Sequence, residues 1–185
     1  MLNDISEPAP TELAAPWVLK PARQGSSVGL QLVDEVGQWD AAFAAVCEHD
    51  DRILCEERII GREITVGILA DEPLPIVEVS PKAGVYDYRN KYTVGATEYF
   101  CPADLPDERA KAIGQLALKA FDAVEGRDFG RVDMMLNVGL KPHVLEVNTL
   151  PGLTETSLLP MAAAAVGLEF SKLCQRMIEL ALQRN

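Results

Sequence analysis

The sequence lacks any apolar run that approaches the ~18 residues of a membrane-spanning helix. Its N-terminus also lacks the basic, apolar and small-residue regions of a signal peptide. We therefore expect a cytoplasmic protein that has no membrane partner.

Cysteine and histidine are scarce. The four cysteines lie far apart, and none belongs to a Cys-x-x-Cys pair; they are Cys47, Cys55, Cys101 and Cys174. This spacing favours reduced thiols in the core or half-buried, and it argues against disulfides and zinc sites. His49 and His143 stand apart from each other and indicate no catalytic triad, so we expect His143 to be structural or to face solvent.

Basic and aromatic residues are also few. Lys and Arg number 17 against 28 Asp and Glu, and the net charge of -11 repels nucleic acid and anionic membranes. A polyphosphate ligand would have to be met by locally placed lysines, arginines and a metal ion. The 48% apolar content suits a mixed helix and strand enzyme core, and 185 residues suffice for one sizeable domain or two small ones.

The hydrophobic periodicity predicts short strands with a few helices between them. Residues 1–15 are proline-rich and weakly patterned, as in a tail or the remnant of an upstream region. Strands are predicted at 17–22, 30–34, 53–58, 63–70, 75–80, 131–137 and 143–148, and helices at 39–49, 106–125, 157–166 and 169–183. We therefore expect an α+β fold with a mainly antiparallel sheet flanked by helices.

The segment from Lys82 to Pro102 has tyrosines, glycines and charges but no sustained period. A loop of this length in a compact domain is usually functional or disordered. Its aromatic content, together with Lys91 and Tyr92, favours a functional lid.

Oxygen-bearing side chains gather on the two strands of the predicted hairpin. Asp133, Glu146 and Asn148 supply the hard oxygen donors that suit Mg²⁺ bridging phosphate groups. Arg131 points to the same strand face as Asp133 because it lies two residues away. The alternative is a strand with one wet and one buried face, but the Glu146-x-Asn148 pair favours a site.

Two further segments are compatible with nucleotide binding. Lys20 closes an apolar strand just before QGSSVG, whose glycines and serines allow close approach to a phosphate. The alternative to phosphate binding is that Lys20 only extends its charged end into solvent at the edge of the sheet and that QGSSVG is an ordinary hairpin loop. The strand end at Glu56 and Glu57, leading to Glu63, is either a solvated edge or a contact for adenine and ribose.

Six segments in this order resemble one family. KPARQGSSVG, EERIIGREITVGIL, YDYRNKY, FCPADLP, GRVDMML and EVNTLPGLTETSLLP are similar to the C-terminal half of D-alanine–D-alanine ligases, which are ATP-grasp enzymes. The resemblance covers roughly residues 16–183. It implies an ATP-grasp C-terminal domain and ligation of two D-alanines through an acylphosphate, for synthesis of peptidoglycan precursors.

The resemblance also implies roles for the residues above. ATP and two Mg²⁺ ions, with Mn²⁺ as a substitute, are the expected cofactors, and Asp133, Glu146 and Asn148 would hold the metals. The expected nucleotide contacts are Lys20, Gly25, Ser26, Ser27, Glu56, Glu57, Ile59, Glu63 and Lys91.

For the amino-acid substrate, the resemblance implies that Arg131 stabilises the tetrahedral oxyanion. Ser157, Leu158 and Gly152 would bind the second D-alanine. Tyr92 and Ser26 would hydrogen-bond as the lid closes. A homodimer is also compatible with the family.

The resemblance further implies a domain organisation. Residues 16–52 would form part of the central subdomain and residues 53–185 the C-terminal domain, without the family's N-terminal domain. The first D-alanine site would then be incomplete, as in a truncated or fragmentary copy. Two alternatives are a catalytically incomplete Mg-ATP or Mg-ADP binding module and an ATP-grasp ligase with another amino-acid acceptor.

Overall fold

The computed structural model describes residues 7–82 and 95–183. These residues divide into two compact units. The first unit contains the described residues up to Arg58 together with 95 and 96, and the second contains 59–82 and 97–183. Within the described ranges, every helix is too short or too polar to cross a membrane.

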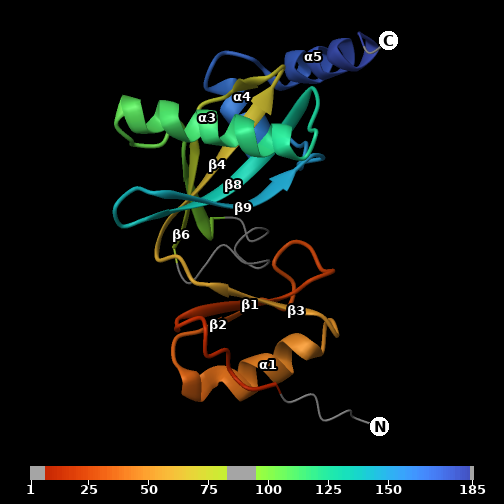
Figure 1. The fold of residues 1–185 in the computed structure, drawn as a ribbon. Helices are drawn as coiled ribbons and strands as arrows, with labels where there is room; N and C mark the ends of the chain where they lie inside the picture. The colour runs from red at the N-terminus through yellow and green to blue at the C-terminus, as the bar shows by residue number, and fades with distance from the viewer. Residues whose placement is uncertain (1–6, 83–94, 184–185) are drawn as a thin grey trace. The chain divides into compact units, whose positions relative to one another are not determined.

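The first unit is a three-stranded antiparallel sheet covered by one helix (Figure 1). Its strand order is β2-β1-β3, and its elements are β1 (Trp17–Pro21), β2 (Gln31–Val33), the 3₁₀ turn η1 (Val36–Gln38), α1 (Trp39–Cys47) and β3 (Ile53–Glu57). Trp39 and Phe43 lie one turn apart on α1, and Trp39 meets Trp17 of β1 edge to face with ring centroids 5.4 Å apart. This aromatic cluster forms the core of the unit.

Asp50 ties the start of the QGSSVG loop to the turn before β3. Its carboxylate accepts the backbone N–H of Arg23 at 2.7 Å and that of Arg52 at 3.0 Å, and the Asp50 side chain is only 3% exposed. The hydrogen bond from Arg52 and then that from Arg23 lower the pKa of Asp50 below its ordinary value of 3.8, against the opposing effect of burial. The anchor is therefore strongest when this carboxylate is ionised.

We expect Asp50→Ala to lower the stability of the chain at pH 7 and to change its dependence on acid. Because the pKa of Asp50 is lower in the folded state, its contribution is complete above the unfolded value and is lost as pH falls through the folded value. Urea unfolding should therefore show a clear difference between variant and wild type at pH 7 that shrinks below about pH 4. Asp51→Ala, which removes a 74% exposed neighbour, should have a much smaller effect.

The second unit is built on a larger antiparallel sheet (Figure 1). Its strand order is β7-β6-β4-β8-β9, with β5 paired to β4. The strands are β4 (Gly61–Leu69), β5 (Glu72–Pro73), β6 (Val77–Pro81), β7 (Thr97–Phe100), β8 (Phe129–Asn137) and β9 (Pro142–Asn148), and the helices are α3 (Asp107–Ala123), α4 (Leu158–Ala164) and α5 (Phe170–Leu182).

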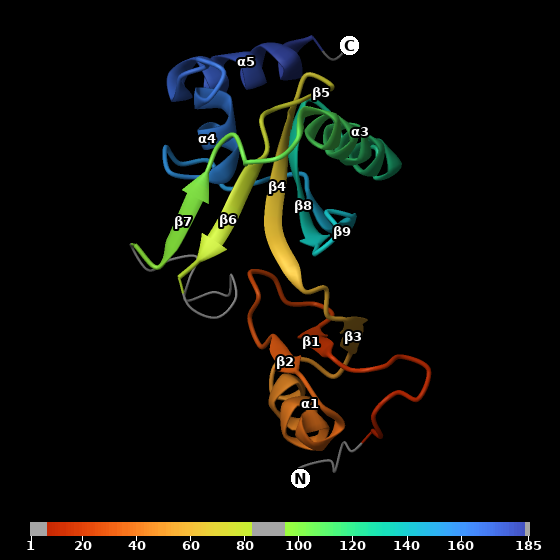
Figure 2. The same ribbon diagram turned by 90° about the vertical axis from the view of Figure 1, so that its left-hand side faces the viewer.

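Helices cover both faces of this sheet, as Figure 2 shows around β4. Alternate apolar residues of β4 and β8 form one core with the inward stripe of α3: Ile64, Val66, Ile68, Val132, Met134, Leu136, Ile113, Ala117 and Phe121. On the opposite face, Leu69 packs with Ala163 of α4 and Leu173 of α5. The helices α4 and α5 cover this face only near the Leu69 end of β4. The part of the same face at residues 63–65 therefore carries polar side chains.

The predicted α+β class with a mainly antiparallel sheet is confirmed, and each predicted helix and strand is present within a few residues. Two short strands are additional, β5 and β7. The prediction of a continuous loop at 82–102 is wrong for residues 97–100, because β7 pairs with β6 as an edge strand too short to show a period. Residues 83–94, including the centre of the predicted lid, lie outside the described residues.

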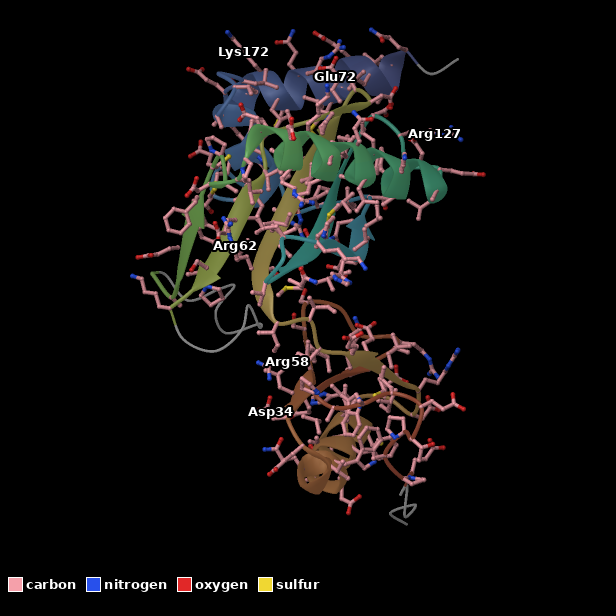
Figure 3. All side chains as sticks on the ribbon, turned by 60° about the vertical axis from the view of Figure 1, so that its left-hand side comes forward. Asp34, Arg58, Arg62, Glu72, Arg127 and Lys172 are labelled. Carbon is pink, nitrogen blue, oxygen red and sulfur yellow. The ribbon has the colours of Figure 1, made fainter. Side chains whose placement is uncertain are left out.

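The boundary between the units also differs from the expected one between residues 52 and 53. β3 pairs with β1 over five residues, so residues 53–57 belong with the first unit. Arg58 follows them there and forms an ion pair with Asp34 at 2.6 Å (Figure 3).

The four cysteines are free and half-buried, as predicted. Burial raises the pKa of the thiols of Cys47, Cys55 and Cys101. A raised pKa keeps these groups protonated and unreactive at neutral pH.

Candidate metal and phosphate site

Polar residues form a patch on one face of the second unit's sheet, across β4, β8 and β9. The register of the three strands sets them in rows, because directly paired residues point to the same face. A bulge at Asp133/Met134 adds one residue to β9 and keeps the rows aligned on both sides of it. Read across β4, β8 and β9, the rows are Glu63–Met135–His143, Thr65–Asp133–Glu146 and Gly67–Arg131–Asn148.

Asp133 is the centre of the patch, and both of its carboxylate oxygens accept two hydrogen bonds. Its Oδ1 accepts from the Thr65 hydroxyl at 2.5 Å and from Nε of Arg131 at 2.8 Å. Its Oδ2 accepts from Nη2 of Arg131 at 2.8 Å and from Nδ2 of Asn148 at 2.9 Å. Four donors match the approximately four lone-pair directions of a carboxylate, so Asp133 is held in one orientation.

Asn148 links the two predicted acidic ligands. Its Nδ2 donates to Oδ2 of Asp133 at 2.9 Å and to Oε1 of Glu146 at 3.1 Å. Asn148 is therefore within hydrogen-bonding distance of both predicted acidic ligands. A half-turn of the Asn148 amide exchanges Nδ2 for Oδ1 and adds a third oxygen to the two carboxylates.

The charge and donor set of the patch fit a hard divalent cation. Two carboxylates face one guanidinium, so the local charge is negative. The side chains of Arg131 and Asp133 are only 16% and 14% exposed, which strengthens their electrostatic interactions. In nucleotide sites, Mg²⁺ takes oxygen ligands from protein carboxylates and amides and from the phosphates of the nucleotide. Within the described ranges, no cluster of three or more Asp, Glu, His or Cys residues offers an alternative.

Sequence reasoning missed Thr65 and Met135 as members of the patch. Thr65 lies two residues after Glu63 on β4, and Met135 two residues after Asp133 on β8. The alternation of a strand places each beside a predicted site residue. His143 completes the Met135 row and is half-buried; its Nε2 is buried without a hydrogen-bond partner among the described residues.

The three residues predicted to bind the second D-alanine lie close together at the start of α4. Oγ of Ser157 accepts the backbone N–H of Thr154 at 3.1 Å, and a Cβ at Gly152 would lie 3.2 Å from that Oγ. Leu158 buries its side chain, so only its backbone is available to a ligand. Leu159 packs against Gly67, which places α4 on the same sheet face as Arg131.

The remaining predicted phosphate contacts lie in the first unit. Nζ of Lys20 forms an ion pair with Glu56 at 2.7 Å on neighbouring strands. Ser26 and Ser27 both have positive φ, 56° and 60°, in a turn closed by the Val28 N–H and the Gly25 carbonyl at 3.1 Å. Consecutive serines in the left-handed region are uncommon and mark the loop as a candidate functional element.

The other predicted nucleotide contacts are divided between the units. Glu57 is exposed on β3 of the first unit, whereas half-buried Ile59 and Glu63 belong to the second. Lys91 and Tyr92 lie outside the described residues.

An antiparallel sheet with acidic oxygens on one face, together with a smaller strand and helix unit carrying a glycine-serine loop, is typical of the ATP-grasp class. Residues 2–179 match the family model described as D-ala D-ala ligase C-terminus. The chain belongs to this family.

Individual relatives agree with the family. A D-alanine–D-alanine ligase from Methylacidiphilum infernorum is 47% identical over 169 residues, which are 91% of this chain and 56% of the relative. The crystal structure of the Bacillus anthracis D-alanine–D-alanine ligase complexed with ATP is 35% identical, with a TM-score of 0.77 and coverage of 93% of this chain and 55% of that one. The VanG D-Ala:D-Ser ligase from Enterococcus faecalis is 34% identical, with a TM-score of 0.80 and coverage of 91% and 50%. The chain thus spans about half the length of the relatives it matches.

Proposed function

We propose that this chain is the metal- and nucleotide-binding part of an ATP-dependent D-alanine–D-alanine ligase that serves peptidoglycan precursor synthesis in the cytoplasm. The observation that carries the proposal is the joining of Asp133, Glu146 and Asn148 on adjacent strands, with Arg131 bonded to the same carboxylate. Family membership supplies the reaction class, and the patch supplies groups suited to phosphate chemistry.

Asp133, Glu146 and Asn148 are assigned to hold the metal. Mg²⁺ held there would supply positive charge that neutralises the negative charge developing on the transferring phosphoryl group. Thr65 and Arg131 hold Asp133 from the protein side, so the carboxylate does not have to reorganise when the ligand arrives.

Lysines and backbone groups are assigned to the nucleotide. Lys20, Lys91 and the Gly25-Ser26-Ser27 turn would contact the phosphates, since two cations and the backbone N–H dipoles of the turn oppose the charge of ATP. The strand end at Glu56, Glu57 and Ile59 provides the adenine edge with hydrogen-bonding groups, and Glu63 accepts from the ribose. In the structure Lys20 is paired with Glu56, and an ion pair that is in part open to solvent, as this one is, is weak enough to exchange for a phosphate.

Arg131 and the turn before α4 are assigned to the amino-acid chemistry. A carboxylate oxygen of the first D-alanine attacks the γ-phosphorus and displaces ADP, which gives an acylphosphate. The amine of the second D-alanine then attacks the acyl carbon, loses a proton and expels inorganic phosphate. Arg131 stabilises the oxyanion of the tetrahedral intermediate with its fixed guanidinium.

The second D-alanine would bind through its carboxylate. Ser157 offers a hydroxyl to it, and Leu158 and Gly152 offer backbone groups at the same turn. Tyr92 and Ser26 would hydrogen-bond when the lid closes and keep water from the acylphosphate.

A second candidate is ligation of D-alanine to another amino-acid acceptor. The likeness to a D-Ala:D-Ser ligase at 34% identity favours it. The metal and nucleotide residues would be the same, and the two candidates would differ only in the acceptor.

The proposal is tested with the 185-residue chain itself. ADP with Mg²⁺ should raise its Tm relative to either ligand alone, since a ligand that binds the folded state stabilises it by mass action. ATP, Mg²⁺ and D-alanine should then be supplied with the chain alone and with the separately expressed remainder of a relative, and dipeptide measured by mass spectrometry. D-Serine and other acceptors are scanned in parallel. If ADP does not raise the Tm, the nucleotide site is refuted. If ADP and Mg²⁺ raise the Tm but no dipeptide forms under either condition, the chain is a nucleotide-binding module without ligase activity.

A further inference from the structure

Thr65 is one of two buried polar residues in the described part of the chain. It is 2% exposed, lies in the middle of β4 and pairs directly with Asp133 of β8. Its hydroxyl is 2.5 Å from Oδ1 of Asp133 and 3.3 Å from the carbonyl oxygen of Val132. A polar group buried this deeply is retained only where it is hydrogen-bonded.

The single proton of the hydroxyl goes to Asp133. A hydroxyl donates once, and of the two acceptors Oδ1 is closer by 0.8 Å and carries negative charge. Short O–H···O bonds to a carboxylate are about twice as strong as neutral ones. Thr65 therefore fixes Oδ1 from the neighbouring strand β4.

The two oxygens of Asp133 differ in how they are held. Oδ1 is bonded to Thr65 and Nε of Arg131, whereas Oδ2 is bonded to Nη2 of Arg131 and to Asn148, itself a proposed metal ligand. A cation that approaches Asp133 replaces donors on one oxygen. Since turning the Asn148 amide releases Oδ2, that oxygen is free to coordinate while Oδ1 keeps both of its bonds.

We propose that Thr65 is a positioning residue for the divalent cation: its buried hydroxyl holds Oδ1 of Asp133 so that Oδ2 faces the metal. This inference rests on the proposed function, because it assumes that Asp133 is a metal ligand. Arg131 alone would not do the same, because its two donors bind both oxygens and pull equally on each. Once the Asn148 amide has turned away from Oδ2, Thr65 is the donor that still distinguishes the two oxygens.

The test compares two substitutions that separate the hydroxyl from the rest of the side chain. Thr65→Val keeps the branched shape and removes the hydroxyl, whereas Thr65→Ser keeps the hydroxyl and removes a methyl group. We expect T65V to weaken binding of Mn²⁺ in the presence of ADP by about 10- to 100-fold, the usual effect of losing a hydrogen bond behind a metal ligand. The Mn²⁺ affinity of T65S should stay within a fewfold of that of wild type. T97V, which changes another buried strand threonine, is the control, and its Mn²⁺ affinity should equal that of wild type.

Free Mn²⁺ measured by electron paramagnetic resonance gives the affinity without any need for turnover. Binding of ADP without metal should be the same in T65V as in wild type, because Thr65 acts only through Asp133. Wild-type affinity in T65V overturns the inference. So does a loss in T65S as large as that in T65V. If T65V fails to fold, T65S is compared with wild type instead, and a loss of Mn²⁺ affinity of about 10-fold or more in T65S, which keeps the hydroxyl, overturns the inference.

Failure of the proposed function gives a different pattern. If wild type binds Mn²⁺ with the same affinity with and without ADP, the nucleotide assignment is refuted. The Mn²⁺ affinities of T65V and T65S still decide the role of Thr65 in that case. If wild type binds no Mn²⁺ with or without ADP, Asp133 is not a metal ligand and both proposals are refuted.

Discussion

Asp133→Ala should abolish the stabilisation that Mg²⁺ adds to ADP binding. Asp133 is the only residue of the patch whose carboxylate is bonded to Thr65, Arg131 and Asn148 at once. Its loss removes one of two acidic ligands and also one of the two acceptors that orient Asn148. With ligand at about a hundred times Kd, wild type gains roughly 2.7 kcal/mol, which corresponds to about 5 to 10 °C in Tm for a chain of this size.

The measurement is the increase in Tm caused by ligand, taken separately for ADP, Mg²⁺ and both together. Asp133→Ala also removes bonds from the guanidinium of Arg131, so the Tm without ligand is expected to fall. The increase rather than the Tm is therefore compared between variants. Asp122→Ala, which removes an exposed carboxylate from α3 of the same unit, should keep the full increase. If ADP with Mg²⁺ raises the Tm of Asp133→Ala as much as that of wild type, the metal assignment is refuted.

The hairpin of β8 and β9 shows how far local sequence predicts a site. RVDMMLN alternates clearly, so the β8 strand and the shared face of Arg131 and Asp133 follow from a period of two. HVLEVN keeps this period less well, because Val144 and Leu145 are adjacent apolar residues. The bulge at Asp133/Met134 does not follow. It depends on which residues of the two strands pair, and a period within one strand carries no information about register.

Thr65 illustrates what local sequence cannot reveal. Its neighbours in the chain are apolar, and a threonine in a strand is favoured by its branched shape alone. Its importance comes from pairing with Asp133, a residue 68 positions away. Such a contact depends on the order of strands in the sheet, which propensity and alternation do not fix.

Strand pairing also explains the two misjudged regions. Thr97–Phe100 is too short for a period to be recognised, and only its pairing with β6 makes it a strand. The expected domain boundary places residues 53–57 with the segment that follows them, whereas their hydrogen bonds lead back to β1. In contrast, α3 has a 17-residue amphipathic pattern with acidic residues in its first turn, which was sufficient to predict it.

Gly61→Ala is expected to have the largest effect on stability of any single methyl addition in the second unit. Gly61 begins β4 and pairs with Asn137 at the end of β8. A Cβ at Gly61 would overlap the carbonyl oxygen of Leu136 and lie 2.8 Å from its carbonyl carbon. The obstacle is backbone, so rotation of a side chain cannot relieve it.

The strands must therefore separate or shift where they meet. β4 and β8 pair over nine residues in the centre of the sheet, and each residue's facing partner depends on that register. We expect Gly61→Ala to destabilise the chain by about 3 kcal/mol or more, because an added group that overlaps the paired backbone acts as severe overpacking. Urea unfolding followed by circular dichroism measures the loss.

Gly139→Ala is the matched control. Gly139 lies in the turn between β8 and β9, and a Cβ there would meet only the Asn137 side chain, at the ordinary contact distance of 3.4 Å. A change within about 0.5 kcal/mol is expected, as for most surface substitutions. If Gly61→Ala were equally mild, β4 and β8 could not approach each other as the structure has them. The Thr65–Asp133 pair depends on that same approach four residues further along β4, so the stability of this variant also tests the geometry on which the metal site rests.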